Sequence, residues 1–184
     1  MIRAPLFICY NLHMLAKNKQ LLTDRLVLKS IEQKDKKDFM EIVKDPLVKK
    51  TYMLPDFANE KEEDIFFKKL RDYTLDSEKF VYGIYSKNKI IGFLNEVTRE
   101  NDEAEIGYFI TPKEWNKGYA TEALNVIIKE LFRAGFKSVL CGHFEENAAS
   151  RRVMQKCGMT KAEKEETVTY RNKEHHCFYY RIKQ

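Results

Sequence analysis

The residue types between Pro112 and Leu124 are suited to holding an anion. Residues 106–110 read as a strand, and a strongly periodic helix follows the turn. Gly118 and Ala120 put small side chains in that turn, where large ones would block the backbone. Unpaired N–H groups at a helix N-terminus, together with the helix dipole, attract a bound anion. The segment therefore predicts a cradle for a phosphate-bearing cofactor.

The helix that leaves this turn is the clearest element of the sequence. Its apolar residues recur at spacings of three and four and form one continuous face: Ala120, Ala123, Leu124, Ile127, Ile128, Leu131 and Phe132. Gly135 is expected to end this helix in a left-handed cap. Asn147 is expected to cap a second, short helix that ends before Gly158.

The remaining elements place this strand–turn–helix unit in a sheet. Helices are expected over residues 35–44 and 59–73, the second capped by Asn59. Strands are expected over residues 22–30, 80–85, 89–97, 104–110, 137–144, 166–170 and 176–182. Residues 86–88 separate two of these strands as a hairpin turn would. The order predicts a mixed α/β (α+β) fold whose sheet is largely antiparallel, with one parallel crossover.

Size and composition favour one globular domain. The chain has 184 residues, of which 43% are hydrophobic and 33% charged. Residues 22–184 are predicted to form that domain, and residues 1–21 an N-terminal extension. A signal peptide is not expected, because Asn11 and His13 interrupt the apolar run and no small-residue cleavage site follows.

Charge and cysteine usage limit which classes of partner the sequence predicts. The net charge is +5, and the 33 basic residues are interspersed with 28 acidic ones, so direct nucleic-acid binding is not expected. No run is long and apolar enough to predict a membrane span. The four cysteines show no CxxC pair and no metal spacing, so we expect a reduced, cytoplasmic protein without a metal.

Three segments resemble the GNAT N-acetyltransferase superfamily, and most closely its RimJ/RimL-like branch. They are Trp115–Ala123, Asn147–Met159 and the opening Thr23–Leu28, and the similarity covers about residues 22–183. The resemblance implies a GNAT-type sheet flanked by helices, with a strand–loop–helix cradle for a pyrophosphate. It also implies an enzyme that moves the acetyl group of acetyl-CoA to a primary amine by direct attack.

The resemblance also implies which residues bind acetyl-CoA. In this family backbone N–H groups of the loop hold the pyrophosphate, and Gly118 and Ala120 match its small positions. Trp115 stands where the family has Gln or Arg, which costs a polar contact but leaves a backbone cradle intact. The implied cofactor-binding residues are Phe109, Ile110, Asn116, Lys117, Gly118, Tyr119, Ala120, Thr121, Asn147 and Ser150.

Catalytic residues follow from the same resemblance. Family members often carry a general-base glutamate on the strand before the loop, which makes Glu105 the first candidate and Glu103 the second. Alternation puts both on one face of that strand, where they are alternatively plain solvated carboxylates. Met154 occupies the slot of the usual tyrosine acid, so the branch's serine, Ser150, is the candidate acid. Ser150 can alternatively bond local backbone.

Other functions remain open at this stage. A non-catalytic acyl-CoA-binding or regulatory module would keep the cradle without the chemistry. A ribosome-associated binding protein is a further alternative. The acceptor of an enzyme could be a protein N-terminal α-amine, a polyamine or another small molecule, and Tyr52, Met53 and Phe57 are candidates to line its groove. A monomer and a homodimer are both compatible with the sequence.

Overall fold

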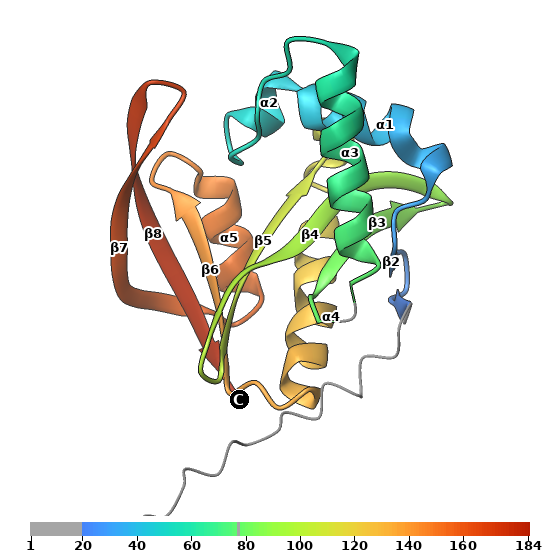
Figure 1. Ribbon diagram of the computed structural model, residues 1–184. Coiled ribbons are helices and arrows are strands. Elements are labelled where there is room, and N and C mark those ends of the chain that lie inside the picture. Colours follow the sequence, from blue (N-terminus) through green and yellow to red (C-terminus); the bar gives the residue numbers. More distant parts are fainter. Residues whose placement is uncertain (1–19, 77) are drawn as a thin grey trace, which may run out of the picture.

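Eight strands form one central sheet in the order β1-β2-β3-β4-β5-β6-β8-β7 (Figure 1). The structure is a computed structural model that describes residues 20–76 and 78–184. The strands are β1 (Leu21–Leu22), β2 (Val27–Lys29), β3 (Val81–Ser86), β4 (Lys89–Glu100), β5 (Glu103–Ile110), β6 (Ser138–Phe144), β7 (Thr160–Tyr170) and β8 (Lys173–Lys183). Only β5 and β6 pair in parallel. The predicted mixed α/β fold, with its largely antiparallel sheet and one parallel crossover, is confirmed.

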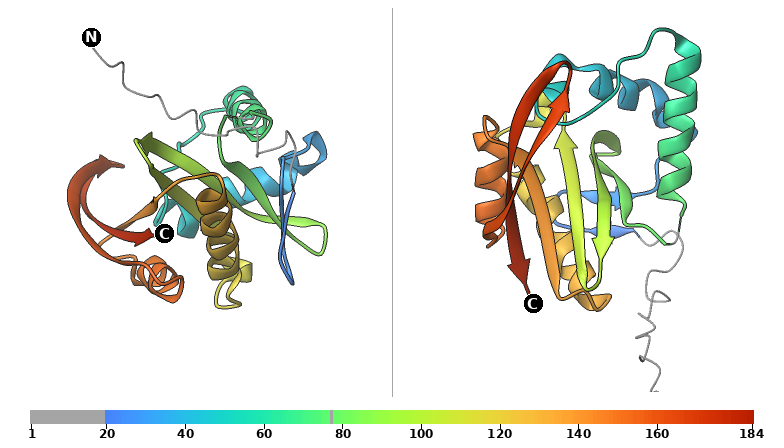
Figure 2. Two further views of the ribbon diagram at one scale, coloured as in Figure 1. Left: turned by 90° about the horizontal axis from the view of Figure 1, so that it is seen from below. Right: turned by 60° about the vertical axis from the view of Figure 1, so that its left-hand side comes forward.

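Helices cover both faces of this sheet. They are α1 (Lys36–Lys44), α2 (Pro46–Lys49), α3 (Glu60–Thr74), α4 (Tyr119–Arg133) and α5 (Ala148–Lys156), with 3-10 turns η2 (Gln33–Asp35) and η3 (Pro112–Glu114). Helices α1, α2 and α3 lie on one face, and α4 and α5 lie on the other (Figures 1 and 2). Each face therefore has its own hydrophobic core.

The two cores bury the helix stripes that the sequence predicts. On the α1–α3 face, the Phe39 ring of α1 packs edge-on against Phe93 of β4, with centroids 5.7 Å apart. On the α4–α5 face, Leu124 of α4 and Met154 of α5 are fully buried in the other core. Burying a large apolar side chain contributes about 1.5–3 kcal/mol, so these contacts fix both helix layers on the sheet.

The structure differs from the sequence prediction at several boundaries. The strand expected over residues 22–30 is two short strands, β1 and β2, joined by a turn in which Thr23 N–H donates to the Leu26 carbonyl at 3.0 Å. An unpredicted helix, α2, begins at Pro46, where the Asp45 side chain caps it by accepting from Leu47 N–H at 2.8 Å. Asp45 lies between the two helices, as the C-cap of α1 and the N-cap of α2. Asp suits the N-cap position and Pro the first helical position, so a new helix begins at Pro46.

The N-terminal extension predicted for residues 1–21 falls almost wholly outside the described residues. The structure describes the chain from residue 20, and Leu21 and Leu22 already form β1. The boundary between an extension and a single domain over residues 22–184 stays a prediction.

Strands β5 and β6 part shortly after they begin. They pair only at Glu103↔Ser138, Ala104↔Val139 and Glu105↔Leu140. Beyond this point β5 continues along β4 to Gly92↔Ile110, while β6 continues along β8 (Figure 1). The far halves of β5 and β6 therefore lack strand hydrogen bonds to each other, and we call the region where the two strands part the opening.

Gly92 holds β4 close to the end of β5. A Cβ atom at this position would lie 2.3 Å from the Phe109 carbonyl oxygen, which is backbone and cannot rotate away. We expect Gly92→Ala to lower the free energy of unfolding by about 1–3 kcal/mol in a urea titration, as overpacking does. Gly142→Ala is the matched comparison, because its Cβ would meet the Tyr179 ring at 2.8 Å, and that side chain can shift. Equal losses in the two variants would contradict the backbone clash.

Candidate active site

The predicted anion cradle lies at the N-terminus of α4. Gly118 caps this helix with a φ of 82°, and Asn116 two residues earlier has a φ of 61°. Left-handed backbone of this kind favours glycine and tolerates asparagine. Gly118 has no side chain to offer the helix, and the first N–H groups of an α-helix have no intrahelical partner. The N–H groups of residues 119–121 are therefore directed at the space in front of α4.

Glu122 ties this cradle to the first two strands. Its carboxylate accepts hydrogen bonds from Thr23 Oγ1 at 2.5 Å, from Arg25 N–H at 3.0 Å and from Arg25 Nε at 2.7 Å. Arg25 Nη1 also donates to the Lys117 carbonyl at 2.9 Å. Burial alone would raise the pKa of Glu122, but these hydrogen bonds outweigh it and lower that pKa. One carboxylate thus joins two segments that are far apart in the sequence and fixes the cradle's backbone.

Trp115 closes the strand end beside the cradle. Its indole Nε1 donates to the carbonyl of Ile110, the last residue of β5, at 2.7 Å. The ring is 39% exposed, so it lies at the edge of the site and not in the core. Trp115 therefore positions the loop through the backbone, in a slot where Gln or Arg was the expected side chain.

Asn147 and Ser150 form the first turn of α5. The Asn147 side chain caps the helix by accepting from Ser150 N–H at 3.0 Å, as the sequence predicts. The Ser150 hydroxyl, however, lies 2.9 Å from the Tyr108 hydroxyl of β5. This contact crosses from α5 to β5 on the α4–α5 face of the opening. The Ser150 hydroxyl thus reaches a second side chain and is not confined to its own helix.

Tyr108 is the polar group that the sequence analysis missed. It packs against the α4–α5 core, and burial raises its pKa well above the ordinary value, so it stays protonated at neutral pH. Met154, in the slot of the usual tyrosine acid, is fully buried in the same core. Strand alternation could have pointed to it, because alternation places Tyr108 on the face opposite Glu105.

The two candidate bases lie in different surroundings. Glu105 is at the last β5–β6 pair, on the α1–α3 face, with Oε2 3.1 Å from Lys164 Nζ. Glu103 accepts from Arg181 at 2.5 and 3.0 Å and from Ser138 Oγ at 2.6 Å. Arg181 is the main reason that the pKa of Glu103 is lowered. Glu103 is therefore held as a structural ion pair, whereas Glu105 stands at the opening.

The opening brings most of the predicted residues together from two sides. The cradle over residues 116–121, Asn147 and Ser150 lie on the α4–α5 side, and Glu105 lies on the other. Phe109 and Ile110 bury their side chains in opposite cores, so what they can offer a ligand is backbone.

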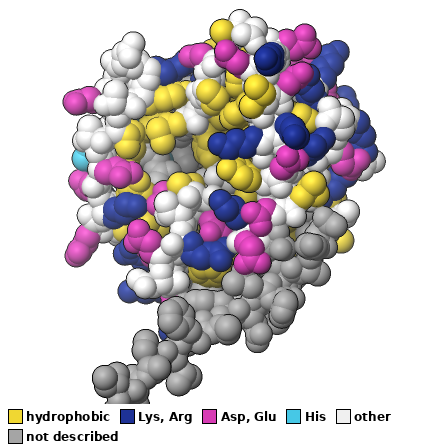
Figure 3. Space-filling view, in the orientation of Figure 1, with side chains coloured by type: hydrophobic (Ala, Val, Ile, Leu, Met, Phe, Trp, Pro, Cys, Tyr) yellow, Lys and Arg dark blue, Asp and Glu magenta, His cyan; other side chains and the backbone are white. Residues whose placement is uncertain are grey.

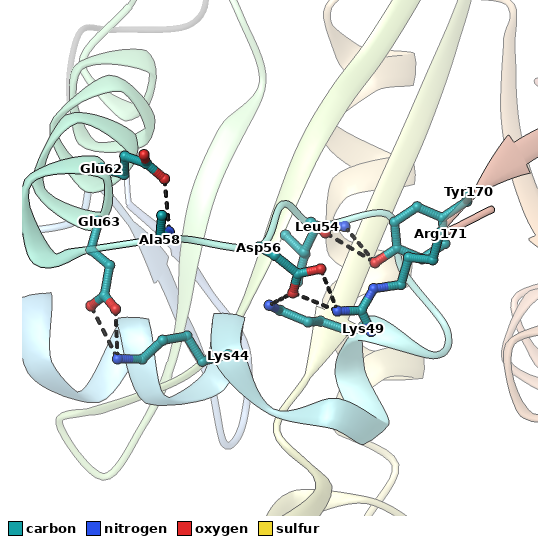
Figure 4. A network of polar contacts seen from close by, with 9 residues as sticks. All are labelled: Lys44, Lys49, Leu54, Asp56, Ala58, Glu62, Glu63, Tyr170 and Arg171. Atoms are coloured by element: carbon teal, nitrogen blue, oxygen red, sulfur yellow. Dashed lines mark hydrogen bonds and ion pairs between the residues drawn. The ribbon is translucent and has the colours of Figure 1, made fainter.

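A set of polar contacts joins the loop between α2 and α3 to the turn between β7 and β8 (Figure 4). Asp56, in the loop between α2 and α3, binds Lys49 Nζ at 2.6 Å and Arg171 Nη2 at 2.5 and 2.6 Å. Arg171 and Lys49 hold the pKa of Asp56 at about 2. The Tyr170 hydroxyl donates to the Leu54 carbonyl at 3.0 Å. The turn between β7 and β8 is therefore fastened to the loop before α3.

The residues predicted to line an acceptor groove, Tyr52, Met53 and Phe57, lie in the loop between α2 and α3. Met53 is 55% exposed, and Tyr52 donates to Asn95 Oδ1 at 2.5 Å. In the space-filling view, hydrophobic side chains gather in the upper part of this face around a hollow (Figure 3). An acceptor entering here would meet an apolar wall with charged groups at its rim.

Two further classes of site find no support within the described residues. Residues 20–76 and 78–184 contain no group of three or more His, Cys, Asp or Glu side chains arranged to hold a metal ion. None of the helices in those ranges has both the length and the apolarity that crossing a membrane requires.

Comparison with known proteins gives one family. The model of a family described as "Acetyltransferase (GNAT) domain" matches residues 25–160. "Uncharacterized N-acetyltransferase p20" of Bacillus licheniformis is 29% identical over 129 residues, which are 68% of this chain and 70% of that protein. The crystal structure of an acetyltransferase (GNAT family) from Bacillus anthracis superposes with a TM-score of 0.75 at 25% identity, covering 90% of this chain and 98% of that one.

A third likeness is to a solved structure of lower sequence identity. RimL, described as a ribosomal L7/L12 alpha-N-protein acetyltransferase and solved in complex with coenzyme A, superposes with a TM-score of 0.73. Its identity is 16%, and the match covers 90% of this chain and 98% of RimL. At this identity the likeness shows the fold alone.

The ion pair between Glu103 and Arg181 should make the free energy of unfolding depend on pH. The pKa of Glu103 is lowered in the folded state, so its contribution is present above the unfolded value of about 4.3 and is lost as the pH falls through the folded value. We expect Glu103→Gln to lower the free energy of unfolding at pH 7 and this deficit to shrink below about pH 4. Denaturant titrations of both proteins across pH measure the deficit, and one that is constant with pH would contradict it.

Proposed function

The chain belongs to the GNAT acetyltransferase family, and we propose that it transfers the acetyl group of acetyl-CoA to a primary amine. The observation that carries the proposal is the opening between β5 and β6, with a backbone cradle on one side and Glu105 on the other. A thioester held on the first side can be attacked from the second. We further propose that the reaction is direct attack by the amine, without an acetylated enzyme.

The cradle fits the pyrophosphate of acetyl-CoA. Gly118 and Asn116 adopt left-handed backbone just before α4, whose first N–H groups lack intrahelical partners and whose dipole adds positive potential there. A Cβ at Gly118 would lie at an ordinary contact distance of 3.4 Å from Arg25 Nη2, so the φ of 82°, and not crowding, is what favours glycine here. We propose that the N–H groups of residues 116–121 bind the phosphates, with Phe109, Ile110 and Asn147 along the pantetheine arm.

Glu105 is proposed as the general base. An amine of the lysine type has a pKa of about 10.4 and is largely protonated at neutral pH, so a proton must leave before attack. Glu105 lies on the face opposite the cradle, 12% exposed, at the last β5–β6 pair. It can therefore accept the proton, directly or through water, while the thioester approaches from the other face. Glu103, already bound to Arg181, serves the fold.

The leaving thiolate is proposed to receive its proton from the Ser150–Tyr108 pair. Both hydroxyls lie on the α4–α5 side of the opening, 2.9 Å apart. The raised pKa of Tyr108, caused by burial, keeps its hydroxyl protonated at neutral pH, so a donor proton is present when the C–S bond breaks. A proton leaving Ser150 can then be replaced from Tyr108.

The acceptor is proposed to be a protein N-terminal α-amine, with a polyamine or another small amine as the alternatives. Likeness to RimL, a protein described as acting on a ribosomal protein, supports the first. The exposed Met53 and half-buried Tyr52 offer an apolar wall that suits an extended peptide better than a compact cation. We also propose a reducing, cytoplasmic setting, since Cys141, Cys157 and Cys177 are free thiols.

An assay of thiol release separates the enzyme from a binding module. The purified chain is incubated with acetyl-CoA and, in turn, N-terminal peptides, polyamines and aminoglycosides, and free CoA is measured. We expect release that depends on an amine and is fastest with peptides. Acetyl-CoA binding by calorimetry without release for any amine would instead favour the non-catalytic module, and the same preparation can be tested for ribosome binding.

Glu105→Gln tests the base. General-base catalysis contributes about 10²–10⁴-fold, so we expect kcat to fall by about 100-fold or more, with a changed kcat–pH profile. The affinity for acetyl-CoA should stay near that of the unmodified chain, because Glu105 lies on the face opposite the cradle. Glu103→Gln is the matched control on the same strand. If the pH profile changed in that variant instead, the base would be Glu103.

Ser150→Ala and Tyr108→Phe test the proton donor as a pair. Each removes one hydroxyl of the 2.9 Å contact and leaves the other. We expect either to lower kcat, Ser150→Ala the more strongly, and the double variant to lose less than the product of the two factors because the hydroxyls act in series. Multiplicative losses in pre-steady-state thiol release would contradict a relay.

A further inference from the structure

We propose that the protein acetylates its own Lys164, an inference that rests on the proposed function. The ammonium group of Lys164 lies 3.1 Å from Glu105 Oε2, the atom proposed to take the proton from the acceptor amine. A primary amine of this chain thus already stands where an acceptor amine has to stand. Nothing in the acetyl-transfer reaction distinguishes it chemically from an external alkylamine.

The backbone of β7 aims Lys164 at this point. Lys161 pairs with Tyr180 and Glu165 pairs with Phe178, so residues 162–164 share the single partner position of Tyr179. Extra residues of this kind form a bulge, which bends a strand and re-aims its side chains, often beside active sites. Lys164 Nζ lies 4.1 Å from the centre of the Tyr179 ring, a cation–π contact that stabilises the position of the ammonium group.

The curvature of the sheet brings β7 back toward β5. In the sheet order, β6 and β8 separate these two strands. The strongly curled β7–β8 pair nevertheless reaches over the same face (Figure 2), and the contact between Lys164 and Glu105 spans the gap. The Lys164 side chain is 41% exposed, so its long stem keeps freedom to move.

The reaction balances with acetyl-CoA alone. Lys164 Nζ gives one proton to the Glu105 carboxylate, and its lone pair attacks the acetyl carbonyl carbon. The C–N bond forms, the C–S bond breaks, and CoA leaves as a thiolate that takes a proton from the Ser150–Tyr108 pair or from water. The second proton lost by the nitrogen passes to water and replaces the one that the thiolate took. The products are one Nε-acetyl-lysine, CoA as the thiol and one proton, which Glu105 releases to solvent. The modified side chain has no charge, so its ion pair with Glu105 and its cation–π contact with Tyr179 are both lost.

Lys161 offers a matched internal control. It lies on the same strand, and its ammonium is 4.1 Å from the centre of the Phe178 ring, as Lys164 is from Tyr179. Its carboxylate partner is Glu165, at 2.9 Å, on β7 itself. Its exposure of 51% slightly exceeds that of Lys164, so uncatalysed acetylation should favour Lys161.

The test is a time course of the full chain with acetyl-CoA and no added amine, followed by peptide mass spectrometry. We expect acetyl to accumulate on Lys164 about 100-fold faster than on Lys161, a factor typical of a positioned base. The rate constant should not depend on protein concentration, since the amine belongs to the same chain. Glu105→Gln should slow Lys164 to the rate of Lys161 and leave Lys161 unchanged.

Three results would overturn the inference. They are equal rates at the two lysines, a Lys164 rate unaffected by Glu105→Gln, or a Lys164 rate proportional to protein concentration. Thiol release with the amine panel, measured on the same preparation, separates the two levels of failure. Turnover of an external amine without selective acetylation of Lys164 rejects self-acetylation alone. Absence of both acetyl-CoA binding and thiol release rejects the proposed function and the inference with it.

Discussion

The limited pairing of β5 with β6 is the constraint on which the site depends. Three residue pairs join the strands, and after Glu105↔Leu140 each follows a different neighbour. A sheet that stayed paired would bury every backbone group and separate its two faces completely. In the proposed reaction, the acetyl donor is held at the N-terminus of α4 and the amine approaches the carboxylate on the opposite face, which requires these strands to part.

Two sets of hydrogen bonds between distant segments hold the elements around the opening, one at the start of α4 and one between β5 and α5. The Glu122 carboxylate binds Thr23 and Arg25, and Arg25 in turn binds the cradle's backbone, so β1 and β2 support the start of α4. Across the opening, Tyr108 of β5 meets Ser150 of α5. The Thr23–Glu122 and Tyr108–Ser150 hydrogen bonds are partly buried, which limits screening by water, whereas the Arg25 contacts are exposed. The surface ion pair of Asp56 with Arg171 is a weaker fastening, because exposed charges are screened.

Much of the fold and part of the site could be predicted because they rest on local rules. The stripe from Ala120 to Phe132 gave α4, Gly135 ended it, and Asn147 capped α5. Spacing and residue type were enough in each case. The short strands β1 and β2, the helix at Pro46 and the start of β7 at Thr160 were not foreseen. Their boundaries depend on which segments pack beside them, and local propensity does not contain that.

The sequence by itself determined the two helix N-termini, their small or capping residues and the alternation that separates Glu105 from Tyr108. Those features follow from backbone sterics and from side-chain periods of two and of 3.6 residues. Only the tertiary structure decided the partner of each carboxylate, because Glu103 and Glu105 share a face but Glu103 meets Arg181 and Glu105 meets Lys164. It alone brought Lys164 of β7 to Glu105, through a bulge and a curved sheet. Partners that distant in the chain are chosen by packing, and packing has no local signature.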